Sequence, residues 1–277
     1  MALGDLTRVN TNLQAIGSLN TLQKTNSELG MRQLRLATGS RLNRAEDDSA
    51  GYTISKKLEA RVRGQAQALS NIGDAKSMLT VAEGSLNSIM DILHTMKEKT
   101  VQAANDTLGS NERTAIKTEL NALSAEIGDI IGDSTFNGTA LFSSGTSTFK
   151  FQVNADSGDT FSASISSVTV SGLGVGSTAL TVGSAGVAAT TLTNISGAID
   201  KVASRISSIG DSQKRLSFKQ ENLATSMNNY EAARSRIADA DFAKEQMQIV
   251  KLQILQQTGT ASLAQANAAP QSVLSLF

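Results

Sequence analysis

The chain has 277 residues, with 25 basic and 25 acidic side chains, one His and no Cys, so its formal net charge is zero. This length allows one or two domains with a substantial apolar core. The balanced charge disfavours nucleic acid and anionic membranes as partners, and the lack of Cys excludes disulfides, thiolate metal sites and a cysteine nucleophile.

The N-terminal stretch predicts a long amphipathic helix over residues 5–37. The opening MALGDLTRVNTN lacks the apolar run of about 7–15 residues that a signal peptide needs, which by itself indicates a cytoplasmic protein. Residues 9–23 carry no charged side chain. The apolar positions recur at helical spacing and are Leu6, Val9, Leu13, Ile16, Leu22, Leu29 and Leu36. A polar connection is expected over residues 41–49.

Residues 51–104 carry the clearest periodic pattern. Apolar residues alternate at spacings of three and four, as in a coiled-coil seam, at Ile72, Ala75, Leu79, Ala82, Leu86, Ile89, Leu93 and Met96. A helix of this length spans roughly 80 Å. A second seam over residues 111–132, after a short turn, predicts an antiparallel pair. The one histidine, His94, lies in this pattern without a Gly-x-Ser-x-Gly motif, so we expect no catalytic residue in the chain.

Residues 134–189 are rich in Ser, Thr, Gly and Phe and predict β structure. Apolar residues alternate with polar ones on either side of a polar turn, at Phe149, Phe151 and Val153 and then at Phe161, Ala163 and Ile165. This period of two is typical of a β-hairpin. The glycines at 172–176 lack the GK[ST] ending and the βαβ context of a phosphate loop, so a flexible surface or a short strand is favoured.

Residues 195–237 return to the heptad pattern, and a last helix from residue 242 enters a tail without charged side chains, residues 252–277. The tail contains too many Gln and Asn residues to span a bilayer, and Pro270 is expected to end its helix. Uncharged amphipathic stretches at both ends predict paired terminal helices. We therefore expect a mainly α fold: a long antiparallel coiled-coil rod with a small β-hairpin at its tip.

Several stretches of the sequence resemble bacterial flagellin. They are Asn10-Thr11-Asn12, RLATGSRLNRAEDDSAG at residues 35–51, ARSRIADADFA at residues 233–243, and much of residues 253–276, including PQSVLSL. The resemblance covers about residues 6–142 and 194–277. The residues between these two ranges are similar only in general character.

The resemblance implies an extracellular protein. Flagellins self-assemble into the helical filament used for swimming, and they leave the cell unfolded through the flagellar type III export channel, without a cleaved signal peptide. The implied partners are further copies of the chain, the flagellar cap, the hook-filament junction proteins and an export chaperone at the C-terminal segment. No nucleic acid, membrane, metal or cofactor is implied. A chain without Cys suits passage through a narrow channel.

The resemblance also implies two inner domains and no outer ones. Residues 1–43 and 237–277 are expected to form the inner core domain. Residues 44–142 and 194–236 are expected to supply the long helices of the rod domain, and residues 143–193 its hairpin and variable region.

Apolar residues of the terminal helices are the first candidates for contacts between copies. A helix pair buried on one side leaves an apolar strip, and burying a Leu or Ile contributes about 1.5–3 kcal/mol, which can offset the entropy of ordering the ends. The predicted residues are Leu13, Ile16, Leu22, Leu29, Ile254, Leu255, Leu263, Val273, Leu274 and Leu276. The alternative is that they form only an intramolecular core.

Charged residues near the connection form a second candidate set: Arg41, Asp47, Asp48, Arg234 and Arg236. Glu46, Asp47 and Asp48 lack the spaced oxygen ligands of a calcium loop, so we expect helix N-terminal charges, or salt bridges to Arg41, Arg44 or a neighbouring copy. Such contacts between copies would let the packing switch between two states.

A third set concerns the animal Toll-like receptor. Flagellins recognised by this receptor present Arg and Leu one turn apart on the long helix pair, with a Glu from the next helix. The matching positions are Thr95, Lys99 and Glu119, of which only the Glu is kept. Lys places a charge where an apolar contact is required, so we predict weak receptor activation.

Two other functions are alternatives. A hook-filament junction protein would share the terminal helices, although the ending PQSVLSLF favours the filament subunit. A soluble coiled-coil adaptor would not explain the uncharged termini. An enzyme is disfavoured because the sequence lacks clusters of titratable residues.

Overall fold

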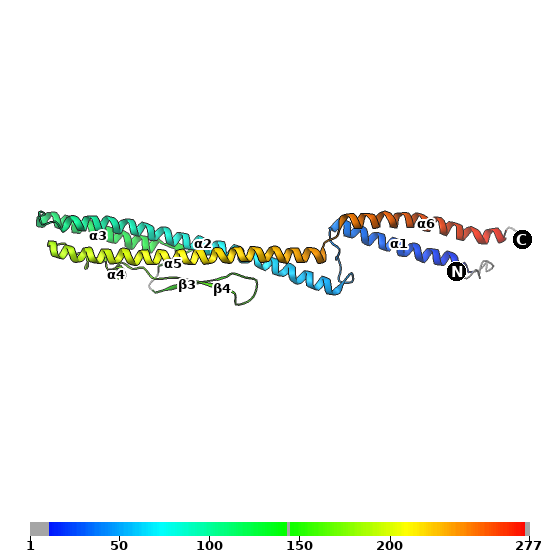
Figure 1. The fold of residues 1–277 in the computed structure, drawn as a ribbon, viewed down its shortest axis with the longest axis horizontal. Coiled ribbons are helices and arrows are strands. Elements are labelled where there is room, and N and C mark those ends of the chain that lie inside the picture. Colours follow the sequence, from blue (N-terminus) through cyan, green and yellow to red (C-terminus); the bar gives the residue numbers. More distant parts are fainter. Residues whose placement is uncertain (1–10, 143–144, 275–277) are drawn as a thin grey trace. The chain divides into compact units, whose positions relative to one another are not determined.

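The computed structural model describes residues 11–142 and 145–274 (Figure 1). These residues form six helices and four strands, which confirms the predicted mainly α class with a small β region. The chain divides into a terminal unit, Met1–Ala60 with Asn229–Phe277, and a central unit, Arg61–Asn228.

The central unit is built on three long helices, α2 (Ser49–Ala103), α3 (Ser110–Asp133) and α5 (Ala185–Ala238), of which α2 and α5 continue into the terminal unit. All eight predicted seam positions of α2, from Ile72 to Met96, are at most 1% exposed. Half of the predicted apolar heptad positions of α5 are buried, namely Ile195, Val202, Ile209, Leu216 and Leu223. The others are half-buried, namely Ile199, Ile206, Met227, Tyr230 and Ile237. Spacings of three and four keep these residues on one helix face, so the predicted seams are confirmed.

Two small antiparallel sheets follow α3. Strands β1 (Thr135–Phe136) and β2 (Thr139–Ala140) are joined by Asn137 and Gly138, whose φ angles of 49° and 77° suit a two-residue hairpin turn. Strands β3 (Ser147–Gln152) and β4 (Thr160–Ile165) form the predicted hairpin, with Phe151 opposite Phe161. In β4 every second residue is buried, which confirms the predicted period of two.

The position of the β3–β4 hairpin differs from the prediction, because it lies along the helices and not at their tip (Figure 1). Its turn is held to the early part of α2 by an ion pair between Arg61 and Asp156 at 3.2 Å, and Asn71 donates to the Gln152 carbonyl. At Gly64 an added Cβ would lie 2.8 Å from the Ala155 Cβ, so glycine permits this close approach. The buried face of β4 requires apolar partners, which the helix flank supplies and a free tip would not.

The glycine-rich segment is not a strand, and it is exposed only in part, at Ser171, Gly172, Ser177 and Thr178. It contains the short helix α4 (Val170–Leu173), which ends at Gly174 with φ 86°. Leu173, Val175, Leu180 and Val182 are buried in the central core. The prediction failed because these apolar residues are spaced irregularly, without a helical or strand period.

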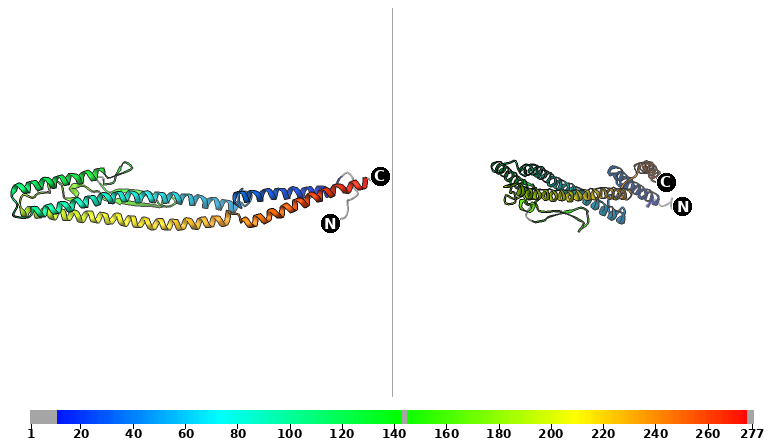
Figure 2. Two further views of the ribbon diagram at one scale, coloured as in Figure 1. Left: turned by 90° about the horizontal axis from the view of Figure 1, so that it is seen from above. Right: turned by 60° about the vertical axis from the view of Figure 1, so that its left-hand side comes forward.

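The terminal unit pairs α1 (Leu13–Thr38) with α6 (Phe242–Leu274), and Figure 2 shows the two helices side by side. This confirms that the terminal helices pair; residues 5–10 of the predicted first helix lie outside the described residues. The contacts run antiparallel, since Arg32 bonds Glu245 and Asn26 bonds Gln256. The apolar cluster between them contains Leu29, Ile249 and Leu252, with Leu36 packed against it.

The helix α6 continues past Pro270 to Leu274, so the prediction that proline ends it was wrong. A proline has no N–H to donate to the carbonyl four residues earlier, which here belongs to Ala266. The Asn12 side-chain amide donates to that carbonyl at 2.7 Å. The carbonyl that Pro270 leaves free is therefore satisfied by the other terminal helix.

The two polar atoms of the Asn12 amide can be separated by substitution. Its Oδ1 caps α1 by accepting from the Ala15 N–H at 2.9 Å. Asn12→Asp keeps the cap but removes the donor to Ala266, so we expect the Ala15 amide to stay protected while the end of α6 frays; Asn12→Ala loses both, with about 1 kcal/mol for the cap. Residue-resolved hydrogen exchange checks this, with Asn20→Asp as the charge-matched control. Equal protection of α6 in Asn12→Asp and the control would contradict it.

Candidate functional site on the terminal helix pair

The described side chains among the predicted apolar assembly residues are exposed, half-buried or buried. Leu13, Ile16, Ile254 and Leu255 are 56%, 49%, 58% and 46% exposed. Leu22 and Leu263 are half-buried. Leu29 is buried in the cluster between α1 and α6. The side chains of Val273, Leu274 and Leu276 lie outside the described residues.

Further exposed apolar residues of the same helices were not among the predicted candidates. On α1 they are Leu19, Met31 and Leu34, and on α6 they are Phe242, Met247 and Val250. They lie off the faces that α1 and α6 turn toward each other. A search for apolar residues off the predicted seam would have found them.

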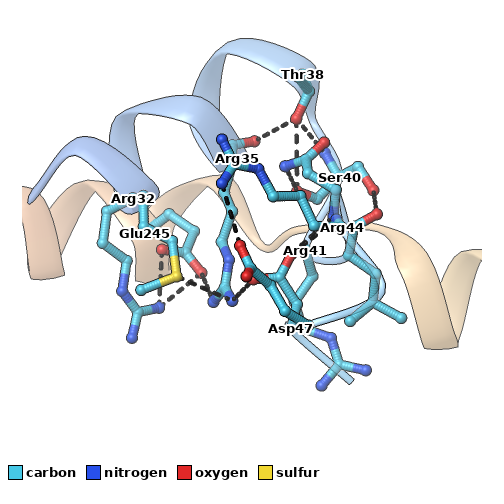
Figure 3. Close-up of polar contacts among 12 residues, drawn as sticks. Arg32, Arg35, Thr38, Ser40, Arg41, Arg44, Asp47 and Glu245 are labelled. Carbon is cyan, nitrogen blue, oxygen red and sulfur yellow. Dashed lines mark hydrogen bonds and ion pairs between the residues drawn. The ribbon is translucent and has the colours of Figure 1, made fainter. Parts of the chain in front are cut away.

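A polar network joins α1, the connection after it and α6 (Figure 3). Arg32 donates to both carboxylate oxygens of Glu245, at 2.9 and 3.0 Å. Arg35 lies 4.0 Å from Glu245 and 3.5 Å from Asp47. Glu245 is only 5% exposed, so its charge is buried between two arginines. Because a buried carboxylate needs such partners, this network fixes the register of α1 on α6.

The connection is also fixed by backbone contacts to the end of α5. Helix α1 ends at Gly39, whose φ of 66° suits a left-handed cap. The Arg41 N–H donates to the Ala238 carbonyl at 2.6 Å, and the Arg41 guanidinium donates to the Ile237 carbonyl at 2.7 Å. Ser40 contributes a hydroxyl bond to the Ala238 carbonyl at 3.0 Å.

Asp47 organises the connection from within. Its Oδ2 accepts the backbone N–H groups of Asn43 and Arg44, each at 3.0 Å. The bond from Arg44, with further contributions from Asn43 and the Arg35 charge, lowers the pKa of the Asp47 carboxyl below its ordinary 3.8. Of the acidic residues 46–48, Glu46 forms the expected salt bridge to Arg44, at 3.1 Å. The side-chain partner of Asp47 is instead Arg35 of α1, at 3.5 Å.

The remaining charged candidates have various surroundings. Asp48 caps α2 by accepting from the Gly51 N–H at 2.9 Å, as a helix N-terminal charge is expected to do. Arg234 pairs with Glu231 of its own helix at 2.6 Å. Arg236 is exposed. Contacts of these residues with neighbouring copies stay a prediction.

The receptor-related positions lie together in the central unit. Thr95 is exposed and its hydroxyl bonds back to the Asp91 carbonyl. Lys99 forms an ion pair with Glu119 at 2.7 Å, which joins α2 to α3. The one retained acidic residue is therefore already paired within the molecule. His94, on the same helix, is exposed.

The structure offers little for other chemistry. Among the residues it describes, no group of three or more His, Cys, Asp or Glu side chains is placed to hold a metal ion. Of the helices in the described part of the chain, none is both long and apolar enough to cross a membrane. The exposed apolar surface of the terminal helices is thus the strongest candidate for a functional surface.

Comparison with known proteins decides the family. Residues 9–148 match the family model for the bacterial flagellin N-terminal helical region, and residues 192–277 match that for the C-terminal helical region. The chain belongs to the bacterial flagellins. It is similar to a flagellin from Halalkalibacterium halodurans, with 35% identity over 97% of this chain and 99% of the relative. The flagellar filament 33 kDa core protein of Treponema phagedenis is 33% identical, with the same coverage of both chains.

A solved structure extends the comparison to the fold. A structure described as that of a flagellar hook-associated protein from Vibrio parahaemolyticus matches with a TM-score of 0.59, over 70% of this chain and 100% of that chain. At 17% identity this likeness concerns the fold alone.

Membership of the flagellin family establishes the function in outline. Flagellin is a structural protein of the bacterial flagellar filament, so this flagellin is a filament subunit outside the cell. The resemblance drawn from the sequence is confirmed. The cytoplasmic location that the N-terminal sequence alone indicated is wrong, because the filament to which flagellins belong lies outside the cell.

Acid should loosen the connection through Asp47. Because the pKa of this carboxyl is lowered in the folded state, its stabilising effect is present above the ordinary value and is lost as pH falls through the lowered pKa. We expect hydrogen-exchange protection of the Asn43 and Arg44 amides to be higher at pH 5 than below pH 3, values chosen as roughly bracketing that loss. Asp47→Asn should show low protection at both. The exposed neighbour variant Glu46→Gln should behave as the unmodified protein, and equal protection in all three would contradict the assignment.

We expect this flagellin to activate the Toll-like receptor weakly, and two substitutions to increase the activation. The double variant Thr95→Arg with Lys99→Leu removes the ion pair to Glu119 and restores the Arg and Leu of recognised flagellins. We expect its potency in a receptor reporter-cell titration to rise at least about tenfold, the effect of 1.4 kcal/mol of contact energy. The control is His94→Arg with Lys97→Leu, which changes exposed residues of the same helix. Full potency of the unmodified protein would overturn the prediction.

Proposed function

We propose that this flagellin assembles by completing between copies the apolar core that its terminal helix pair leaves unfinished. The observation that carries the proposal is the exposure of Leu13 and Ile16 on α1 and of Ile254 and Leu255 on α6. Among the described residues, the apolar cluster between the helices has three buried members, Leu29, Ile249 and Leu252, and Ala266 is buried further along α6. A pair with so small a core is marginal alone. Ordering of the ends and growth of the filament are then one event.

The energetic argument rests on many small contributions. Each Leu or Ile fully buried against a neighbour contributes about 1.5–3 kcal/mol. Ordering a residue costs about 1–2 kcal/mol of backbone entropy, so the four exposed residues alone would not order both helices. The exposed Leu19, Met31, Leu34, Met247 and Val250 add to the surface available for burial. Assembly into a tube, where each copy has neighbours on several sides, supplies partners for all of them.

The proposal includes export of the unfolded chain through the flagellar type III system, without a cleaved signal peptide. The absence of Cys supports this, because a chain without disulfides can be threaded. An apolar C-terminal segment would promote aggregation before assembly, which favours an export chaperone that covers it. The flagellar cap and the hook-filament junction proteins are the further partners, at the two ends of the growing filament.

The alternative functions have less support. The relatives are named flagellin and filament core protein and match over nearly their whole length, which favours the filament subunit over a junction protein. The similarity to a hook-associated protein extends only to the fold. A soluble coiled-coil adaptor would leave the exposed apolar residues of α1 and α6 without a role.

Deletion of residues 252–277 tests the proposal. The central unit has its own core, so we expect α2, α3 and α5 to stay folded by circular dichroism, while electron microscopy shows no filament growth from seeds. Filaments of normal length from the truncated chain would refute the proposal.

Point variants refine the same test. Ile254→Ser with Leu255→Ser removes exposed apolar area without shortening the helix and should raise the critical concentration for assembly by at least about tenfold. Ile254→Val with Leu255→Met keeps most of that area and serves as the matched control. An unchanged critical concentration in the serine variant would show that these residues stay in water in the filament.

A further inference from the structure

Helix α1 and the connection after it form a pocket in the terminal unit. The pocket has a volume of about 730 Å³ and is lined on α1 by Ser27, Gly30, Met31 and Leu34. The connection supplies Asn43, Arg44, Glu46 and Asp47, and Arg35 lies between the two walls. We call this the α1 pocket. Met31 and Leu34 are exposed in it, so its helix wall is apolar.

Helix α6 presents an exposed apolar patch in the same unit. The patch consists of Phe242, Ala243, Gln246, Met247 and Val250. We call it the Met247 patch, after a side chain that is 66% exposed. Met fits irregular pockets well because its side chain is unbranched and flexible.

The pocket and the patch cannot meet within one copy. On α1 the residues that contact α6 include Leu29 and Arg32, whereas Met31 and Leu34 lie two positions away, about 200° around the helix. On α6 the same spacing separates Ile249 from Met247. The two surfaces therefore lie on outward faces of the pair, on opposite helices.

We propose that the Met247 patch of one copy docks into the α1 pocket of the next copy. The inference rests on the proposed assembly function and names the contact. A contact between two different surfaces leaves a free pocket and a free patch at the ends of a row, so it continues as an open helical row when the rotation between copies does not close a ring. Open growth is what a filament subunit requires. Patch-to-patch contact would instead close a dimer.

The lysines beside the patch have one exposed carboxylate opposite them at the pocket rim, while Arg35 and Arg44 balance the two acidic residues of the pocket lining. Lys244 and Lys251 are exposed and lie about one turn on either side of Met247. Glu46, at the rim of the α1 pocket, has a side chain that is 71% exposed. Its partner within the copy is the equally exposed Arg44, an ion pair that contributes little in water. A lysine beside the patch can therefore take over Glu46 when the patch docks.

The absence of Cys makes this contact directly measurable. Because the chain has no Cys, any disulfide must form at introduced positions. The variants are Met247→Cys combined with Met31→Cys, and Met247→Cys combined with Leu34→Cys. The matched control is Met247→Cys combined with Gln33→Cys, since Gln33 is exposed on α1 but does not line the pocket. Filaments are oxidised with copper phenanthroline and run on a non-reducing denaturing gel.

A patch-to-pocket contact gives a distinctive result. Each copy carries one Cys in its patch and one in its pocket, so at least one pocket pair should link into a ladder of covalent oligomers well beyond the dimer. Single-Cys variants cannot exceed the dimer. The control should give no ladder. Assembled filaments without a ladder for either pocket pair, or abundant dimers from Met247→Cys alone, would overturn the inference.

A second measurement tests the same contact if the cysteine variants fail to assemble. In the density of filaments of the unmodified protein, the Met247 side chain must lie within about 4 Å of Met31 or Leu34 of a neighbouring copy. A cap, a chaperone or solvent against Met247 in the mature filament would equally overturn the inference. If the unmodified protein forms no filaments, the proposed function fails instead.

Discussion

The contact between α1 and α6 satisfies one face of each terminal helix and leaves the opposite face in water. Leu29, Ile249 and Leu252 are buried between the helices, while Ile16, Met247 and Ile254 are exposed. A helix that carries apolar residues on two faces can be completed only by a second neighbour. In the proposed assembly that neighbour is another copy, so the faces that leave the terminal unit marginal alone are the faces available for contacts between copies.

The central unit follows the opposite rule. Its seams on α2 and α5 bury every predicted heptad residue of α2, and the hairpin and α4 cover the helix flank. This core is formed within one copy, although Val81, Val101, Val187 and Phe218 stay exposed in the same unit. The terminal unit instead depends on charge for its register: Glu245, buried between Arg32 and Arg35, holds α1 against α6 where the apolar cluster is small. Buried ion pairs of this kind contribute more to a unique register than to net stability.

Most of the correct predictions came from patterns within short stretches of sequence, and the wrong ones concerned contacts between residues distant in sequence. The seam from Ile72 to Met96 and the alternation in β4 were predictable because the spacing of apolar residues, every 3.5 or every 2 positions, can be read from short stretches of sequence. The flank position of the hairpin depends on Gly64 and Arg61, far away in sequence. The predicted helix end at Pro270 was wrong because of a contact distant in sequence. Proline gives the Ala266 carbonyl no backbone donor, and Asn12, near the other end of the chain, supplies one. For the same reason Arg35, and not Arg41 or Arg44, proved to be the side-chain partner of Asp47.

If assembly uses the proposed contact, the polar residues of the connection influence it without contacting another copy. Asp47 holds the backbone of Asn43 and Arg44, and those residues form one wall of the α1 pocket. The shape of the pocket therefore depends on bonds made inside one copy. A change in the charge of Asp47 would alter the surface offered to the Met247 patch without touching the patch itself. In the proposed contact, a rearrangement of the connection would be enough to change the packing between copies.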